Sequence, residues 1–125
     1  MLASAASHPG LVREKNEDAY LMLLEQGIFA VADGMGGHLA GAEASHLALK
    51  ILAQNAGKLD PKIDPVCQLT EMVQEANRQV FEQGSRDRCK QGMGTTLTVL
   101  WVLDRMAYIA HVGDSRAYLL RGKSL

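Results

Sequence analysis

Apolar positions near the start of the chain predict a β-hairpin. Residues Ala19–Leu24 and Ile28–Ala32 are two short, largely apolar runs, and Glu25-Gln26-Gly27 lies between them. Runs of this length, separated by a short connection that contains glycine, are typical of paired antiparallel strands.

The middle of the chain follows a helical period instead. Apolar residues recur at spacings of three and four, which predicts two helices. We expect the first helix to end at Gly57, and the second to be capped by Asp64, to have Pro65 in its first turn and to end at Gly84. Each helix has a single apolar face, so each should cover a sheet; these faces consist of Ala44, Leu47, Ala48, Ile51 and Leu52 in the first helix and Val66, Leu69, Val73, Ala76 and Val80 in the second.

The last third of the chain predicts further strands. Thr95–Leu103 is rich in β-branched residues, Asp104-Arg105 separates it from Met106–Val112, and Arg116–Arg121 is expected to be another strand. Strands that surround one pair of helices, without a βαβαβ rhythm, favour an α+β fold with an antiparallel sheet.

The end of the chain suggests an incomplete fold. Gly122 is typical of a hairpin turn, and no return strand follows it. We therefore expect residues 1–125 to form a single partial domain, since a sheet that stopped there would expose an edge. The alternative is that the final residues are a polar tail.

Composition excludes several classes of protein. The chain has 125 residues, of which 47% are hydrophobic and 22% charged, and a formal net charge of -1. This charge offers no electrostatic basis for binding nucleic acid or an anionic membrane. The chain contains no apolar membrane span, and its start lacks the features of a secretory signal. Cys67 and Cys89 form no C-x-x-C pair, so we expect reduced thiols in a cytoplasmic protein.

The stretch IFAVADGMGGHLAGAEAS, residues 28–45, combines an aspartate, Asp33, with a cluster of glycines. It does not match the dinucleotide-binding fingerprint, because Leu39 stands where that pattern needs glycine or alanine, and it does not match a P-loop, because Ala42 replaces the lysine. A carboxylate repels phosphate unless a divalent cation lies between them, and glycines allow a backbone to approach an ion closely. The stretch is therefore either the end of a strand that bears a metal or a structural corner.

Two further clusters carry candidate chemistry. REKNEDAY contains Arg13, whose planar guanidinium suits a phosphate, and the acidic pair Glu17-Asp18. In an extended backbone Glu17 and Asp18 point to opposite faces, so only one of them could address a given site directly. HVGDSRAY places Asp114 at another turn. The alternatives are a solvated charged loop for the first cluster and an ordinary β-turn for the second.

Together these motifs resemble the metal-dependent protein phosphatases of the PP2C type, also called PPM, and most closely their bacterial members. The resemblance rests on RxxNED, ADGMGG, GTT and GDSRAY, which occur in the family's order between Val12 and Leu120. It identifies the chain with the N-terminal part of the catalytic domain. It implies a β-sandwich of two antiparallel sheets flanked by helices.

The resemblance also implies a centre of two Mn²⁺ or Mg²⁺ ions with a possible third. Asp33 would bridge two ions, Gly34 would offer its backbone carbonyl to one of them, and Asp114 would help to hold the third. Glu17 and Asp18 would position metal-bound waters from an outer shell.

The implied activity is hydrolysis of phosphoserine and phosphothreonine in proteins by a metal-activated water, with Arg13 binding the phosphate. The substrates would include targets of serine/threonine kinases. No side-chain nucleophile is needed, so Ser115 and the two cysteines are not catalytic candidates, and His111 is expected to pack within its strand.

Some eukaryotic relatives have histidine directly after the Asp-Gly pair, where this chain has Met35. His38 lies nearby and is expected to be a polar residue at the helix start, without a role as general acid.

Three hypotheses for the activity remain open. The family's remaining metal-binding aspartates lie in segments beyond the matched motifs, so we expect the parent protein to be a phosphatase and this chain alone to be nearly inactive. The alternatives are a catalytically inactive, phosphatase-like interaction module and an unrelated metal-dependent hydrolase with a convergent Asp-Gly turn.

Overall fold

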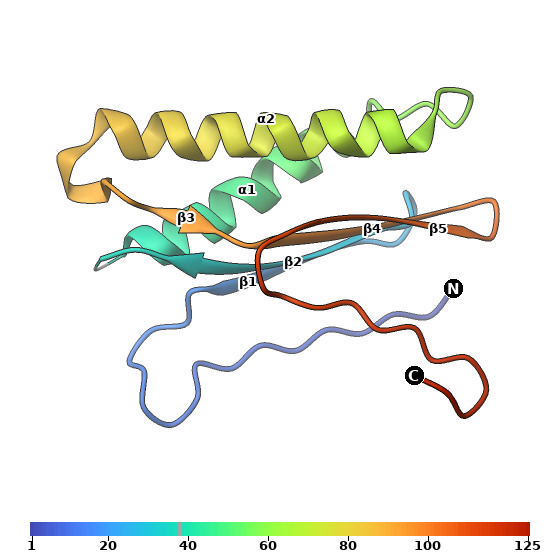
Figure 1. Cartoon of the computed structure of the whole chain (residues 1–125), viewed down its shortest axis with the longest axis horizontal. Coiled ribbons are helices and arrows are strands. Elements are labelled where there is room, and N and C mark those ends of the chain that lie inside the picture. Colours follow the sequence, from blue (N-terminus) through green and yellow to red (C-terminus); the bar gives the residue numbers. More distant parts are fainter. Residues whose placement is uncertain (38) are drawn as a thin grey trace.

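The computed structural model describes residues 1–37 and 39–125, and these form one antiparallel sheet with two helices on one face (Figure 1). The strands β1 (Asp18–Leu23), β2 (Ile28–Met35), β4 (Leu97–Leu103) and β5 (Met106–Val112) lie in the spatial order β1-β2-β4-β5, and the short strand β3 (Gly94–Thr95) pairs with the end of β2. The helices α1 (Ala40–Ala56) and α2 (Pro65–Arg86), followed by the 3₁₀ helix η1 (Arg88–Lys90), connect β2 to β3. The predicted α+β fold with an antiparallel sheet is confirmed.

The opposite face of the sheet is crossed by the two ends of the chain. The N-terminal segment before β1 and the C-terminal segment after β5 run side by side below the sheet in Figure 1, and residues from both line one hollow on this face. Within the described residues neither segment forms a second sheet.

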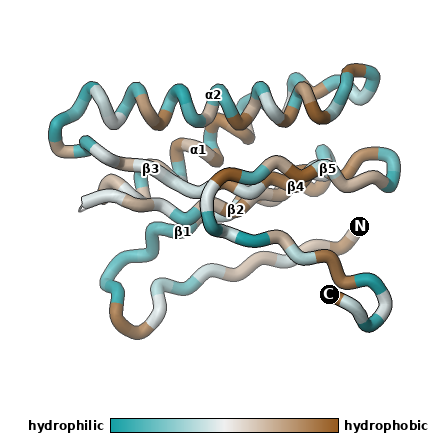
Figure 2. The backbone as a smooth tube through the Cα atoms, in the orientation of Figure 1, coloured by the Kyte–Doolittle hydropathy of each residue, from teal (hydrophilic) through white to brown (hydrophobic). Residues whose placement is uncertain are grey.

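The core lies between the sheet and α1. Alternate residues of β2 and β4 point toward the helices and are buried, as the period of two in a strand requires. Small side chains on β2 and α1 let the helix lie close to the sheet, and larger ones fill the space beside them. Figure 2 shows β4 as a largely hydrophobic strand, whereas α2 alternates between hydrophobic and hydrophilic residues. The buried set includes Ile28, Ala30, Ala32, Ala44, Ala48, Leu52, Leu97, Val99 and Trp101.

The helix boundaries follow their predicted signals, with one exception. The Asp64 carboxylate accepts hydrogen bonds from the backbone N–H groups of Val66 (3.2 Å) and Cys67 (3.4 Å), as expected for an N-cap. Gly57 directly follows α1 as predicted. The predicted end of the second helix at Gly84 is wrong, because α2 continues to Arg86. Gly84 is buried there, and a Cβ at this position would come within 3.1 Å of Met93, so this glycine serves close packing rather than termination.

The prediction for His38, before α1, lies outside the described residues. In the part of the chain that the structure describes, no helix has both the length and the apolar character needed to span a bilayer.

The strand boundaries differ from prediction where long-range pairing decides them. Strand β1 begins at Asp18, one residue earlier than predicted, and β2 continues past Ala32 to Met35 because Gly34 and Met35 pair with β3. Asp33 is therefore inside a strand and not beyond its end.

The predicted turn between β4 and β5 is confirmed. Asp104 and Arg105 both have positive φ values, 49° and 65°, which a two-residue hairpin turn of the type favoured between twisted strands requires.

The predicted strand over Arg116–Arg121 is wrong. The segment runs as irregular backbone, with only an isolated bridge between Arg121 and Ser124 around Gly122. A strand needs a partner for its backbone N–H and C=O groups, and this segment pairs with no other strand of the described residues.

Candidate functional site

The register of β1 and β2 places two aspartates side by side. Asp18 is the direct cross-strand partner of Asp33 in this antiparallel pair. Directly opposed residues lie on the same face of a sheet, and their Cβ atoms are about 5 Å apart. The neighbours of Asp33, Ala32 and Gly34, are buried on the helix side, so both carboxylates project from the other face.

These carboxylates stand at the edge of a hollow of about 330 Å³, which is also lined by residues 6–8 and by Ser115. Asn16 fixes the entry to β1, because its amide group donates to Ser7 Oγ (2.6 Å) and its side-chain oxygen accepts from the backbone N–H of Asp18 (3.1 Å). The N-terminal segment, the hairpin and the turn after β5 therefore meet at one place.

The pKa of the Asp18 carboxyl is raised by its surroundings. Partial burial, the charge of Asp33 and a hydrogen bond with Asp33 raise the pKa of the Asp18 carboxyl above its usual value, and Glu17 adds to this effect. The positive charge of Arg13 acts in the opposite direction. The pair therefore provides a place where a cation would be favourable.

Glu17 lies on the other side of the backbone from Asp18. Its carboxylate is directed toward α1, since a Cβ added at Gly41 would come within 2.6 Å of Glu17 Oε1. Arg13 Nη1 lies 3.7 Å from Glu17 Oε2, and the Arg13 side chain is 71% exposed. The divergence predicted for the two adjacent acids is thus present, and the Arg13 guanidinium is open to solvent beside them.

The backbones of β2 and α1 come unusually close at Gly34. A Cβ at this position would lie 1.9 Å from the carbonyl oxygen of Gly41 and 2.9 Å from that of Glu17. Gly34 N–H donates to the Glu17 carbonyl (3.1 Å), and Ser45 Oγ donates to the same carbonyl (2.7 Å). No side chain fits at this position with the backbone as it stands, so glycine is required for a steric reason.

The turn that carries Asp114 is tied to Asp33 through Thr96. The side chain of Asp114 is exposed, while the next residue, Ser115, hydrogen-bonds through Oγ to Thr96 Oγ1 (2.7 Å). The Asp33 N–H in turn donates to Thr96 Oγ1 (2.9 Å). The structure thus joins the three sequence clusters at one end of the sheet, but brings only Asp18 and Asp33 into a direct carboxylate pair.

A comparison with protein-family models returns a match over residues 12–125, to the family described as protein phosphatase 2C. The chain belongs to the protein phosphatase 2C family.

Named relatives within the PP2C family are bacterial. The chain is 38% identical over 122 residues to the serine/threonine protein phosphatase PstP of Mycobacterium tuberculosis, covering 98% of this chain and 23% of PstP. It is 37% identical over 129 residues to the protein phosphatase PhpP of Streptococcus pneumoniae, covering 98% of this chain and 52% of PhpP. The chain therefore spans about half the length, or less, of these relatives.

The fold agrees with a solved PP2C structure. The catalytic domain of PstP in complex with two manganese ions superposes with a TM-score of 0.87 at 38% identity, covering 96% of this chain and 51% of that domain. The arrangement of sheet and helices is thus that of the PP2C fold.

Three residues that support the PP2C site were not assigned a role from the sequence. Thr96 belongs to the GTT motif, and Gly41 follows the glycine cluster, so both lay within recognised stretches. For Ser45, the sequence shows only a polar residue on an otherwise apolar helix face, which does not predict its hydrogen-bond partner. Its contact with the Glu17 carbonyl joins residues far apart in the chain, and local patterns do not report such contacts.

Other polar side chains near the PP2C site have structural partners. His111 Nδ1 lies 2.9 Å from Thr98 Oγ1 and its Nε2 lies 3.0 Å from the Gly113 carbonyl, so the exposed ring bridges the strand and the turn. Cys67 and Cys89 are free and exposed, and neither lines the hollow beside Asp33.

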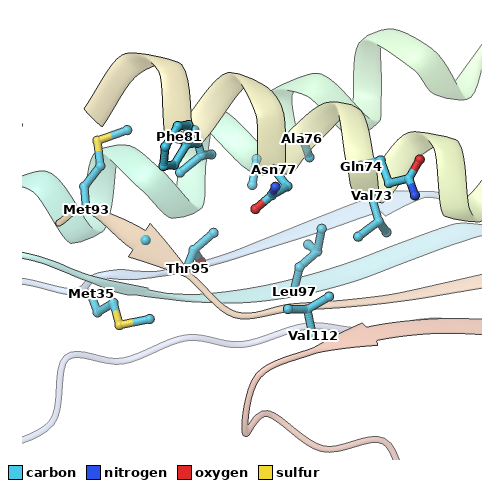
Figure 3. Close-up of a pocket in the computed structure, with 13 residues that line it drawn as sticks. Met35, Val73, Gln74, Ala76, Asn77, Phe81, Met93, Thr95, Leu97 and Val112 are labelled. Carbon is cyan, nitrogen blue, oxygen red and sulfur yellow. The ribbon is translucent and has the colours of Figure 1, made fainter. Parts of the chain in front are cut away.

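A separate apolar hollow of about 510 Å³ lies between α2 and the sheet (Figure 3). Val73, Asn77 and Phe81 of α2 line it from one side, and Met35, Leu97 and Val112 of the sheet also belong to its lining. It contains no carboxylate and does not include the Asp18–Asp33 pair.

Proposed function

We propose that the full-length protein hydrolyses phosphoserine and phosphothreonine in proteins with the help of divalent Mn²⁺ or Mg²⁺ ions. The observation that carries this proposal is the Asp18–Asp33 pair at the edge of a hollow, in a chain whose residues 12–125 match the PP2C family. Relatives in that family are named serine/threonine phosphatases, and a PstP structure contains two manganese ions.

The donor set suits such ions. Carboxylate and carbonyl oxygens are the ligands that Mg²⁺ and Mn²⁺ prefer. Burial and the charge of Asp33 raise the Asp18 pKa, and a divalent cation would offset both effects. Asp33 would bridge two ions and the Gly34 carbonyl would bind one of them. Asp114, on the turn tied to Asp33 through Thr96, would contribute to a weaker third site.

Further donors are needed to complete such a centre. In residues 1–37 and 39–125, no three side chains of histidine, cysteine, aspartate or glutamate gather closely enough to hold an ion by themselves. Other segments of the full-length protein would supply the remaining ligands.

The chain's own residues then have defined tasks in the reaction. Divalent ions, when bound, would supply the lowered pKa that makes water a nucleophile at neutral pH. Arg13, mostly exposed beside Glu17, would bind two phosphate oxygens through its planar guanidinium and stabilise the charge that develops on them. Asp18 and Glu17, on either side of the backbone, would accept hydrogen bonds from waters and orient them.

The substrates would be phosphoproteins, including those modified by serine/threonine kinases, and the reaction would take place in the cytoplasm. The net charge of -1 offers no electrostatic basis for nucleic acid as the substrate.

The test is release of phosphate from a phosphothreonine peptide by the full-length protein with Mn²⁺, compared with its Asp33→Asn variant. We expect the variant to lose activity by about a hundredfold or more, since its amide is a much weaker metal ligand. Circular dichroism of both proteins establishes that each is folded.

Two outcomes would contradict the proposal. Unchanged phosphate release by Asp33→Asn would show that Asp33 does not bind an ion that the reaction needs. A folded wild-type protein that releases no phosphate with either metal would favour a catalytically inactive module. A phosphotyrosine peptide of the same sequence measures the preference for serine and threonine.

A further inference from the structure

Thr96 occupies the break between two strands at the point where the site is assembled. It lies between β3 and β4, belongs to neither, and is only 7% exposed. Its backbone N–H donates to the Asp33 carbonyl (2.9 Å), and its Oγ1 accepts from the Asp33 N–H (2.9 Å). Both main-chain groups of Asp33 are therefore held by one residue, which lies 63 positions later in the chain.

The same side chain also holds the turn after β5. Thr96 Oγ1 lies 2.7 Å from Ser115 Oγ, and a threonine hydroxyl can accept from an N–H while donating its own proton to a second oxygen. The methyl group packs against the turn as well, because a Cβ at Gly113 would lie only 2.6 Å from Thr96 Cγ2. Hydroxyl and methyl therefore have separate contacts.

From these contacts we infer that Thr96 is a positioning residue, which holds the Asp33 carboxylate in place for metal binding by bracing its backbone against the Gly113–Ser115 turn. This inference rests on the proposed function, because it assigns to Asp33 the binding of a divalent ion. Its hydroxyl is engaged by the Asp33 N–H and Ser115 Oγ, so the inference gives Thr96 no direct contact with metal or substrate.

The physical basis is the cost of leaving buried groups unpaired. Without the Thr96 hydroxyl, the Asp33 N–H loses its hydrogen-bond acceptor and Ser115 Oγ loses its hydrogen-bond partner. Both groups are partly buried, so leaving them unpaired costs free energy. The strand segment around Asp33 can then shift to find water. Small displacements of a ligand are costly for a metal site, and loss of a residue that orients ligands typically weakens metal affinity tenfold to a hundredfold.

The chain offers a matched control. Thr98 is also 7% exposed, lies in the adjoining strand β4 and also reaches toward β5, through His111. In the part of the chain that the structure describes, the Thr98 side chain makes no hydrogen bond to Asp33, and it reaches the Gly113–Ser115 turn only indirectly, through the contact of His111 with the Gly113 carbonyl. Thr98→Val therefore removes one equally buried threonine hydroxyl and leaves both side-chain contacts of Thr96, with Asp33 and with Ser115, in place.

The experiment measures Mn²⁺ binding to the full-length protein by isothermal titration calorimetry, for wild type, Thr96→Val, Thr96→Ser, Ser115→Ala and Thr98→Val. We expect Thr96→Val to weaken binding about tenfold to a hundredfold and Thr96→Ser to restore most of it, because serine keeps the hydroxyl. Ser115→Ala, which removes only the link to the turn, should cause a smaller loss. Thr98→Val should bind as wild type does.

A second readout needs no metal. Amide hydrogen exchange of the metal-free proteins should show faster exchange at Asp33 in Thr96→Val and unchanged exchange there in Thr98→Val. If Thr96→Val is too unstable to measure, Ser115→Ala and Thr96→Ser still separate the two contacts.

Equal Mn²⁺ affinity in Thr96→Val and Thr98→Val would overturn the inference, as would a loss in Thr96→Ser as large as in Thr96→Val. The proposed function fails separately, when wild type binds Mn²⁺ but releases no phosphate from the peptide. A wild-type protein that binds no Mn²⁺ would overturn both.

Discussion

Single residues decide the geometry at the end of β2. Gly34 permits the contact between two backbones, and Asp18 and Asp33 face each other because of the register of one hairpin. Each of these features can be tested by a substitution that changes one group only.

Replacing Gly34 with alanine should destabilise the protein strongly. The added Cβ would lie 1.9 Å from the Gly41 carbonyl oxygen, which is backbone and cannot rotate away. Overpacking of this kind typically costs about 1–3 kcal/mol of unfolding free energy, and backbone contact places Gly34→Ala at or above the upper end. Gly37→Ala is the matched control, since none of the described residues beyond its chain neighbours has an atom within 4 Å of a Cβ there. Urea unfolding of both variants measures the difference, and equal midpoints would contradict the steric argument.

Replacing Asp18 with asparagine should have opposite effects on stability and on metal binding. Because the folded state raises the Asp18 pKa above 3.8, ionised Asp18 destabilises the metal-free protein at pH values above the raised pKa. This destabilisation disappears as the pH falls through the raised pKa toward 3.8. Asp18→Asn should therefore have a slightly higher melting temperature than wild type at neutral pH, and the difference should vanish in acid.

The measurement for Asp18→Asn is thermal unfolding in the presence of a chelator from neutral pH to about pH 3, a range that spans the usual carboxyl pKa. The same variant should bind Mn²⁺ more weakly, since it has lost a carboxylate beside Asp33. A melting temperature below that of wild type at neutral pH would contradict a raised Asp18 pKa in the folded state.

At the scale of elements, α1 is the support on which the site rests. It packs against β1, β2 and β3, and Ser45 and Gly41 on its first turns contact the segment that enters β1. The side chain of Leu52, further along α1, is fully buried in the core beneath this arrangement.

Leu52→Ala should therefore cost about 2–5 kcal/mol of unfolding free energy, which is typical of a fully buried leucine. Lys50→Ala, an exposed position on the same helix, should change stability by less than about 0.5 kcal/mol. Denaturant unfolding measures both. A loss below about 1 kcal/mol in Leu52→Ala would show that α1 does not support the core as described.

Secondary structure was predictable where local patterns decide it. Both helices, the β4–β5 turn and the Asp64 cap agree with the sequence, because periodicity, capping and turn residues act over a few neighbouring positions. The predicted helix end at Gly84 was wrong, because the sequence does not distinguish a glycine that ends a helix from one that allows close packing. Arg116–Arg121 has the composition of a strand but has no strand partner within the described residues.

At the scale of the whole molecule, the site draws on three separate parts of the chain. The described residues provide the Asp18–Asp33 pair, Arg13 and the Asp114 turn, and the named relatives are about twice this length or longer. The two faces of the sheet also differ. The helices cover one face. On the other face, half-exposed apolar side chains such as Tyr20, Val31 and Ile109 line a hollow together with the two terminal segments.

We expect the 125-residue chain, expressed alone, to bind Mn²⁺ weakly and to release little phosphate from a phosphothreonine peptide. The reason is that its described residues gather no three metal-ligating side chains at one point. The check is a parallel Mn²⁺ titration and phosphate-release assay of this chain and of the full-length protein. Equal activity of the two would show that residues 1–125 contain a complete catalytic centre.

The amino-acid sequence by itself determined the α+β class, the two helices with their apolar faces, and the four ordered motifs that resemble the PP2C family. All of these depend on residue types at short, regular spacings, which the chain carries whether or not it is folded.

Only the tertiary structure decided which motif residues meet. The pairing of Asp18 with Asp33 and the brace from Thr96 to Ser115 both depend on hydrogen bonds between distant segments. Such bonds form only when strand register and helix packing bring the segments together, because each group needs a partner that the local sequence does not supply.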